Sequence, residues 1–328
     1  MKRVTIKDIA RKVGVTHVTV SKVINNKGRI SEKTKKRVFD AIEALGYYPN
    51  YAAISLVKGK TNNIAVIEPG FTGFPSSIIA GVQEAHVQTN YDLNLYSSRA
   101  TQEGAIKAFS RILNERRADA VIVISIGISD EFLAKYKKAG IPVILIETET
   151  KGASSILADN ENGAFKATEL LLQKGRRRIG LITGDLIGTR PQKERYNGYI
   201  KALKAWGLEP DEKLITRAYY YSFQDGQKAF DDLREKGADS IFCIAGDFVA
   251  YGILDQARKK GVKIPEDFSV IGFDDELMSS CLDLTTVKQP IQEMGKKAFE
   301  MAAASAENKQ KEPETVIFPT ELITRGSV

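Results

Sequence analysis

The sequence predicts a small all-helical head followed by a larger two-lobed α/β body. The first sixty of the 328 residues are basic and carry apolar residues at helical spacing. From residue 64 onward, apolar runs of strand length alternate with helical stretches. This alternation is typical of parallel sheets that helices cover on both faces. A chain of this length is also too long for one ordinary core.

The positive charge of the chain is concentrated in the head. Residues 1–60 contain 14 Lys and Arg, and their only acids are Asp8, Glu32, Asp40 and Glu43, which leaves a local net charge of +10. Because the whole chain carries +7, the remainder is slightly acidic. This asymmetry indicates a head that binds a polyanion, joined to a nearly neutral body.

Three short helices are predicted in the head. Thr5 begins a capping box for the first helix, and Gly14 ends it. Thr16 is placed to cap a second helix over 17–24, and a third helix ends at Gly46. Two helices joined by three residues form a helix-turn-helix candidate.

Composition changes suggest the domain boundaries. We expect a helical head over 1–46, a short helix and linker over 47–61, and an α/β body over 62–328. Pro49 disfavours a continued helix, and Asn50 can cap a short new one.

The body has a repeated β-α pattern. Strands are expected at 64–68, 92–96, 120–124, 142–146, 179–183, 240–244 and 269–273, and helices at 76–89, 101–117, 129–138, 161–174, 192–206, 223–236 and 247–260. The segment at 63–70 is echoed at 178–184, which predicts two similar lobes. Ligands of such sheets bind outside the carboxyl ends of the strands, so we expect a cleft between the lobes.

Several protein classes are disfavoured. The first residues are charged and no apolar run is long enough for a bilayer, so we expect a cytoplasmic protein that does not contact membranes. Cys243 and Cys281 are too few for a disulfide framework and are expected in the core. His17 and His86 are the only histidines, and no catalytic or metal-binding spacing is present. No enzymatic activity, cofactor or metal is predicted.

At this point the chain resembles the LacI/GalR family of bacterial repressors. The motifs that carry the resemblance lie at 4–10 (VTIKDIA), 14–16 (GVT), 19–25 (TVSKVIN), 45–50 (LGYYPN), 195–198 (RYNG), 264–275 (IPEDFSVIGFDD) and 284–290 (LTTVKQP). They occur in the family's order and spacing, and the match extends from Val4 to about Ser327.

The resemblance implies a helix-turn-helix head, a hinge helix and a body like the type I periplasmic sugar-binding proteins. It places lobe 1 at about 62–158 and 290–319, and lobe 2 at about 159–289 and 320–328. It also implies a homodimer on a pseudo-palindromic operator in double-stranded DNA. The sequence given ends without a heptad-patterned tail, which favours a dimer over a tetramer.

By resemblance, His17, Val18 and Lys22 occupy the positions that contact bases. Histidine can donate or accept, lysine suits guanine O6 and N7, and valine can contact a thymine methyl group. Phosphate contacts are expected from Thr5, Thr16, Thr19, Ser21, Asn25 and Thr34. For Thr5 and Thr16, helix capping is an equally good interpretation. The basic run at 33–37 is expected to supply a general attractive field.

In the hinge, Leu56 matches the leucine that the family inserts into the minor groove, and Ala53 would lie beside the partner hinge. Asn50 is a further expected DNA contact. Such an apolar wedge bends the DNA and lets more protein touch it. Ile54 stands where the family often has arginine.

The resemblance also implies an effector cleft in which Arg195 and Asp274 are the strongest pair, because each can bridge two sugar hydroxyls. Tyr221 and Phe74 are expected against the ligand face. Further candidates are Ser76, Asp159, Asp247 and Gln289. A sugar-like effector is favoured, but Gly246 stands where the family often has asparagine. This removes one polar contact that a plain sugar would use and leaves a purine open.

The sequence therefore predicts a repressor that a small, sugar-like molecule controls. One alternative is a global regulator controlled by a phosphorylated carrier protein that docks on the body. A sugar-transport binding protein is a weaker alternative, because it has no use for a basic head.

Overall fold

The computed structural model describes residues 4–24, 28–47, 60–70, 73–184, 189–309 and 312–328. The chain divides into two compact units, Met1–Thr61 and Asn62–Val328, which we call the head and the body. Within the described residues, no helix is both long and apolar enough to cross a membrane.

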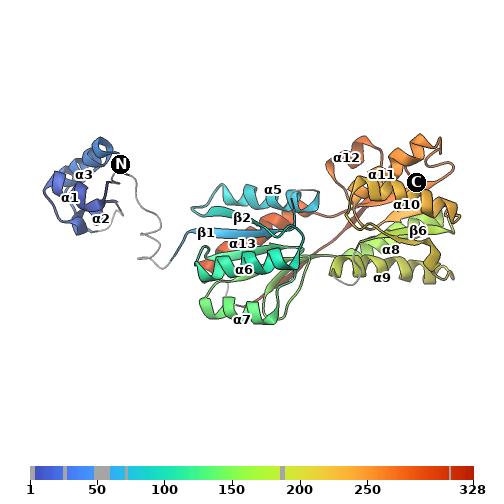
Figure 1. Ribbon diagram of the computed structural model, residues 1–328, viewed down its shortest axis with the longest axis horizontal. Coiled ribbons are helices and arrows are strands. Elements are labelled where there is room, and N and C mark those ends of the chain that lie inside the picture. Colours follow the sequence, from blue (N-terminus) through green and yellow to red (C-terminus); the bar gives the residue numbers. More distant parts are fainter. Residues whose placement is uncertain (1–3, 25–27, 48–59, 71–72, 185–188, 310–311) are drawn as a thin grey trace. The chain divides into compact units, whose positions relative to one another are not determined.

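The described part of the head contains three helices, α1 (Ile6–Val13), α2 (His17–Ile24) and α3 (Glu32–Leu45) (Figure 1). The capping box of Thr5 and Asp8 begins α1, and Gly14 ends it at φ 73°, as predicted. Ile9, Val20 and Val38 are fully buried between the three helices. The helix-turn-helix prediction is therefore confirmed.

One member of the basic run at 33–37 has a structural role. The Arg37 guanidinium donates to the carbonyl oxygen of Val13 at 2.5 Å, which ties α3 to the end of α1. Lys35 pairs with Glu32 at 2.7 Å. Because Glu32 offsets only the charge of Lys35, the attractive field predicted from this run comes mainly from Lys33, Lys36 and Arg37.

The first lobe of the body is a six-stranded parallel sheet in the order β11-β5-β4-β3-β1-β2. Its strands are β1 (Asn63–Glu68), β2 (Asp92–Ser97), β3 (Ala120–Ile124), β4 (Val143–Ile146), β5 (Ser154–Ala158) and β11 (Thr315–Phe318). Its helices are α5 (Phe74–His86), α6 (Gln102–Asn114), α7 (Asp130–Ala139) and α13 (Ile291–Ala306). Side chains alternate along β1, so Val66 packs with α5 and α13 while Ile67 packs with α6 and α7.

The second lobe repeats this plan with the strand order β12-β10-β9-β8-β6-β7. Its strands are β6 (Ile179–Thr183), β7 (Ile215–Arg217), β8 (Ser240–Cys243), β9 (Ser269–Asp274), β10 (Thr285–Lys288) and β12 (Glu321–Ile323). Its helices are α8 (Asn160–Gln173), α9 (Arg190–Ala205), α10 (Phe223–Glu235), α11 (Asp247–Lys259), the short α12 (Leu277–Cys281) and the 3-10 turn η1 (Glu212–Leu214). The α8–α9 pair covers one face of the sheet and the α10–α11 pair covers the other (Figure 1). The two-sheet α/β body is thus confirmed.

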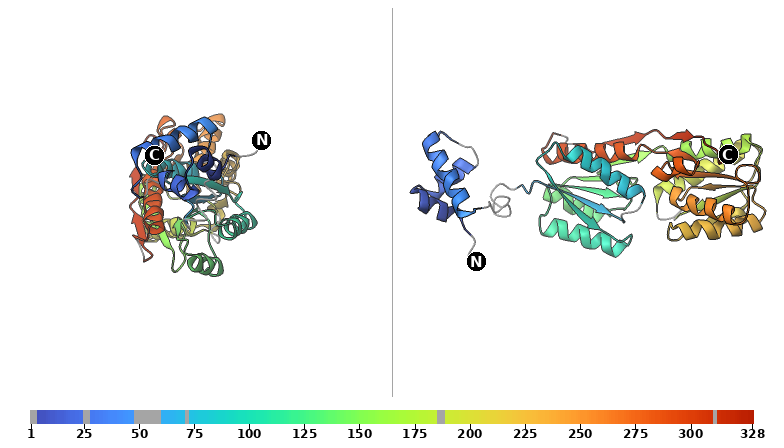
Figure 2. Two further views of the ribbon diagram at one scale, coloured as in Figure 1. Left: turned by 90° about the vertical axis from the view of Figure 1, so that its left-hand side faces the viewer. Right: turned by 90° about the horizontal axis from the view of Figure 1, so that it is seen from above.

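The chain crosses between the lobes three times: from β5 into α8, from β10 into α13, and from β11 into β12. Figure 2 shows the C-terminal strands running from one lobe to the other. Because β5 and β10 each leave their own sheet toward the other lobe, the carboxyl ends of the parallel strands in both sheets face the junction; β12 runs antiparallel to β10. Ligands of open α/β sheets bind at this edge.

The structure adds elements that the sequence patterns did not reveal. These are β5, β7, β10, β11, β12 and the long helix α13. Most of these strands are three or four residues long, and short edge strands carry little periodic signal. One further prediction was wrong: Cys243 is buried as expected, but Cys281 is exposed at the end of α12.

Candidate functional site

The second helix of the head presents one polar and one apolar side. His17, Val18 and Lys22 are exposed, whereas Val20 and Val23 are buried against the other helices. The backbone amide of Thr19 donates to the Thr16 hydroxyl at 3.1 Å, which caps the start of α2. The exposed side is therefore a rigid surface with side chains of the kind that contact base edges.

The other predicted DNA contacts are distributed over the helix starts of the head. The Thr5 hydroxyl donates to Asp8 at 2.6 Å, and Thr34 lies in the capped first turn of α3 beside Ser31. Ser21 is half-buried on α2. Four predicted residues lie outside the described residues: Asn25, Asn50, Ala53 and Leu56.

In the body, Arg195 forms the centre of a buried polar network. Its Nε donates to Asn160 Oδ1 at 2.8 Å, and Nη1 donates to the carbonyl oxygen of Ile244 at 3.0 Å. Nη2 lies 3.6 Å from Asp274 Oδ1. The guanidinium also stacks on the Phe273 ring, 3.7 Å from its centroid. The structure therefore brings together Arg195 and Asp274, the pair that the sequence analysis favoured.

Asp274 ends β9 and is almost completely buried. Gln289 Nε2 donates to Asp274 Oδ1 at 2.6 Å. Burial raises the pKa of Asp274, although Arg195 and Gln289 act in the opposite direction. Its backbone has φ 114°, a conformation that side chains rarely adopt and that is often found at functional sites.

The network also contains two residues that the sequence analysis missed, Asn160 and Glu147. Asn160 Nδ2 donates to Glu147 Oε2 at 2.9 Å, and the Ala158 amide donates to Glu147 Oε1 at 2.7 Å. Glu147 directly follows β4 in the first lobe, so the network joins both lobes. Burial raises the pKa of Glu147. A charged residue directly after a fully apolar strand was the available sequence signal.

Asp247, which we expected to contact the effector, lies in an internal hydrogen-bond network. Its side chain is fully buried and both carboxylate oxygens have protein partners. Thr286 donates to Oδ1 at 2.7 Å, and the Ser279 hydroxyl and Glu276 amide donate to Oδ2 at 2.6 and 3.1 Å. Asp247 therefore fixes the segment that follows Asp274.

The burial of Asp247 leads to a testable pH dependence. Burial, reinforced by the charge of Asp274, raises the pKa of Asp247 to about 8. Between its unfolded pKa of 3.8 and about 8, the folded protein binds this proton more tightly, so the free energy of unfolding falls as pH rises. In Asp247→Asn, the free energy of unfolding, measured with urea at pH 5.5, 7 and 8.5, should fall less steeply with pH than in the parent. Parallel curves for the two proteins would contradict this assignment.

The remaining predicted effector residues are placed differently. The backbone of Tyr221 is in the left-handed region, at φ 51°. Its hydroxyl group packs directly on the backbone of Gly184, in the space that a side chain at that position would need. Phe74 packs against the core of the first lobe, and Ser76 is half-buried in the first turn of α5. Phe74 is thus partly a core residue.

The two lobes also approach each other beside the start of α5. Glu276 Oε1 lies 2.3 Å from where a Cβ on Gly73 would be, so the side chain reaches the backbone of the other lobe. Burial and the charge of Asp274 raise the pKa of Glu276 to about 7.

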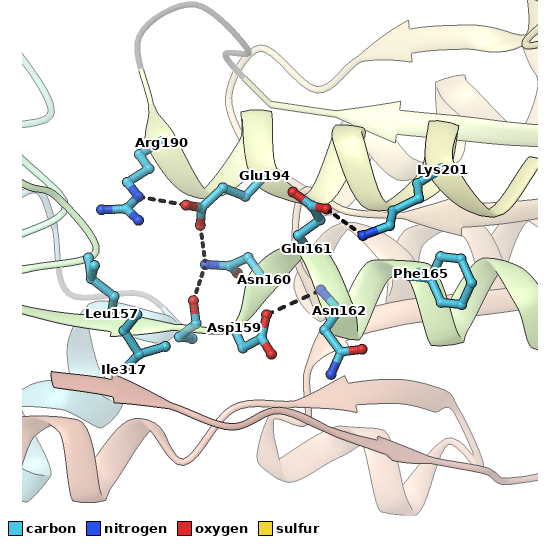
Figure 3. A pocket seen from close by; sticks show the side chains of 11 residues that line it. Leu157, Asp159, Asn160, Glu161, Asn162, Phe165, Arg190, Glu194, Lys201 and Ile317 are labelled. Atoms are coloured by element: carbon cyan, nitrogen blue, oxygen red, sulfur yellow. Dashed lines mark hydrogen bonds and ion pairs between the residues drawn. The ribbon is translucent and has the colours of Figure 1, made fainter. Parts of the chain in front are cut away.

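Asp159 lines a separate cavity of about 450 Å³ at the start of α8 (Figure 3). It accepts from the Asn162 amide at 3.3 Å and so caps that helix. Arg190 and Glu194 form an ion pair of 2.6 Å on the same cavity. Asn160 lines this cavity and also contacts Arg195, so it connects the two sites.

Comparisons with known proteins agree with both parts of the molecule. Residues 5–50 match the model of bacterial regulatory proteins of the lacI family, and residues 168–328 match a periplasmic binding protein-like domain. The HTH-type transcriptional regulator RegA of Clostridium saccharobutylicum is 33% identical over 98% of each chain.

Two solved structures are also similar over nearly the whole chain. The lac repressor dimer bound to operator and the anti-inducer ONPF is 25% identical over 99% of each chain, with a TM-score of 0.87. The complex of the regulator CelR with cellobiose is 27% identical and covers 99% of this chain and 100% of that one, with a TM-score of 0.71. With its helix-turn-helix head, its two-sheet body and a full-length relative at this identity, the chain belongs to the LacI family of bacterial transcription regulators.

Proposed function

We propose that the protein is a repressor that binds a pseudo-palindromic operator as a homodimer, and that a small polar molecule in the lobe junction controls this binding. Its site of action is then the cytoplasm, where the operator DNA lies. The family consists of regulatory proteins, so the protein is not an enzyme.

The observation that carries the effector proposal is the Arg195–Asp274 pair. Both side chains are buried where the carboxyl ends of two sheets face each other, and Asn160 and Gln289 connect them to both crossing segments. A ligand that exchanges hydrogen bonds with this network changes how the lobes sit together. The resulting shift in operator affinity equals the difference in its affinity for the two lobe arrangements. The cellobiose complex of CelR supports a sugar-like ligand.

The dimer proposal rests on an exposed apolar surface of the second lobe, which we call the α11–α12 patch: Phe248, Leu277, Met278 and Leu282. Hydrogen bonds of Ser279 to Asp247 and Tyr251 hold α12 against α11, the two helices that carry these residues or are directly followed by them. Exposed apolar patches of this kind mark protein interfaces. The lac repressor relative is a dimer, so we assign the patch to a second copy of this chain.

The DNA-reading role of α2 can be tested on Lys22. Lys22→Ala should lower affinity for the operator by about 10- to 100-fold, since a good base contact contributes about 1–3 kcal/mol. Its affinity for unrelated duplex should change little. Lys33→Ala, an exposed lysine on α3, is the matched control and should weaken both duplexes alike. Fluorescence anisotropy at fixed salt measures both, and an equal loss on both duplexes in Lys22→Ala would contradict the reading role.

A further inference from the structure

Carboxyl groups outnumber basic groups among the buried side chains of the described residues. Four buried residues carry carboxyl groups and one carries a guanidinium: Glu68, Glu147, Asp247, Asp274 and Arg195. Glu68 ends β1, Glu147 follows β4, Asp247 begins α11 after β8, and Asp274 ends β9. All four carboxyls therefore lie at the strand edges that face the lobe junction, which has an excess of buried acid.

Three of these four carboxyls are satisfied by the protein, and Glu68 is not. Glu147 accepts from Ala158 and Asn160, Asp274 from Gln289, and Asp247 from three donors. Glu68 is fully buried, yet neither Oε1 nor Oε2 has a hydrogen-bond partner. An unpaired buried carboxylate is strongly unfavourable, so this position calls for a partner that the described residues do not supply.

The backbone fixes where the Glu68 side chain points. Side chains alternate along a strand, so Glu68 shares the face of Ile64 and Val66, which pack against α5 and α13. These two helices cross closely near their starts, since a Cβ on Gly295 would lie 2.1 Å from the Ile78 carbonyl oxygen. The carboxylate thus lies at the junction edge of the sheet, beside the start of α5 and the crossing into α13.

A second unsatisfied group lies on that crossing. Gln289 Oε1 is buried and has no partner, while Gln289 Nε2 donates to Asp274. That bond fixes the amide orientation, because an oxygen facing the carboxylate would be repelled. Apart from the Ser155 hydroxyl on β5, the unsatisfied buried side-chain atoms of the described residues are all acceptors at the junction. Both acceptors lie at the lobe junction, so a ligand that contacts either of them there must donate hydrogen bonds.

We propose that the effector carries a positively charged amine that pairs with Glu68; an amino sugar is a molecule of this kind. This inference rests on the proposed function. A neutral hydroxyl group can donate to the Glu68 oxygens but supplies no charge. An ammonium group donates to the same oxygens and also pairs its positive charge with the buried carboxylate. Hydroxyls on the same molecule would then contact Gln289 and the Arg195–Asp274 pair.

The test is a calorimetric titration of the full chain with matched sugars, glucose against glucosamine and galactose against galactosamine. The parent should bind at least one aminated sugar about 10-fold or more tightly than its hydroxyl counterpart. Glu68→Gln should remove about 10- to 100-fold of affinity for that amine and leave the neutral sugar within about 3-fold. Glu84→Gln, an exposed glutamate of α5 paired with Lys296, is the matched control and should change neither.

Each outcome decides the question. A parent that prefers the neutral sugars, or a Glu68→Gln variant with an unchanged amine-to-hydroxyl ratio, overturns the amine inference and leaves the proposed effector control standing. If no sugar binds and none changes operator affinity, the sugar-like effector itself is contradicted along with the inference. Loss of binding to all ligands together with a lowered unfolding midpoint in Glu68→Gln would assign the carboxylate a structural role and also overturn the inference.

Discussion

Arg195→Ala is expected to destabilise the body by about 3–5 kcal/mol and to abolish the effector response. The guanidinium is the only buried cation among the described residues, and its removal leaves Asp274 and Glu147 buried without an opposite charge. It also removes the donors to Asn160 and to the Ile244 carbonyl. Urea unfolding followed by circular dichroism measures the first effect, and operator binding with and without effector measures the second.

Arg190→Ala is the matched control for this prediction. Arg190 lies on the same helix and pairs with Glu149 and Glu194, but about a third of its side chain is exposed. Solvent screens such pairs, so the expected loss is at most about 1 kcal/mol. If the two variants unfold at the same urea concentration, Arg195 does not have the central position that we assign to it.

The double variant Leu277→Glu/Met278→Glu is expected to convert the dimer to a monomer and to lower operator affinity by about 100-fold or more. The Leu277 side chain is 88% exposed in the single chain, so a charge there does not disturb the fold. In a dimer the same charge would be desolvated without a partner. A monomer reads only one half-site, and the contribution of the second half-site is lost. Sedimentation velocity and anisotropy measure the two effects.

The control is Trp206→Glu, which also replaces an exposed apolar residue of the second lobe by a charge. Trp206 follows α9, and the α8–α9 pair covers the sheet face opposite to α11. This variant should remain dimeric with parental operator affinity. A dimeric Leu277→Glu/Met278→Glu protein would show that a different surface joins the two copies.

Local features of the sequence determined the head and the alternating plan of the body. The cap at Thr5, the end at Gly14 and the start of α2 after Thr16 depend on residues within one helical turn. The central strands, such as β3 with five fully buried residues, are continuous apolar runs. Such signals survive in a single sequence because the interactions that produce them are short-ranged.

Only the tertiary structure decided which side chains meet at the lobe junction. Glu68, Glu147, Arg195 and Asp274 come from four separate elements in two lobes, and no spacing in the sequence links them. From the sequence, Asp247 was one candidate ligand contact, and the structure supplies it with three internal donors. Glu68 was not among the candidates, yet it is the buried carboxylate of the described residues that has no partner. The physical reason is that solvation and hydrogen-bond satisfaction are properties of a packed environment. A residue's type shows what it can bind, and the fold decides whether its partner is already present.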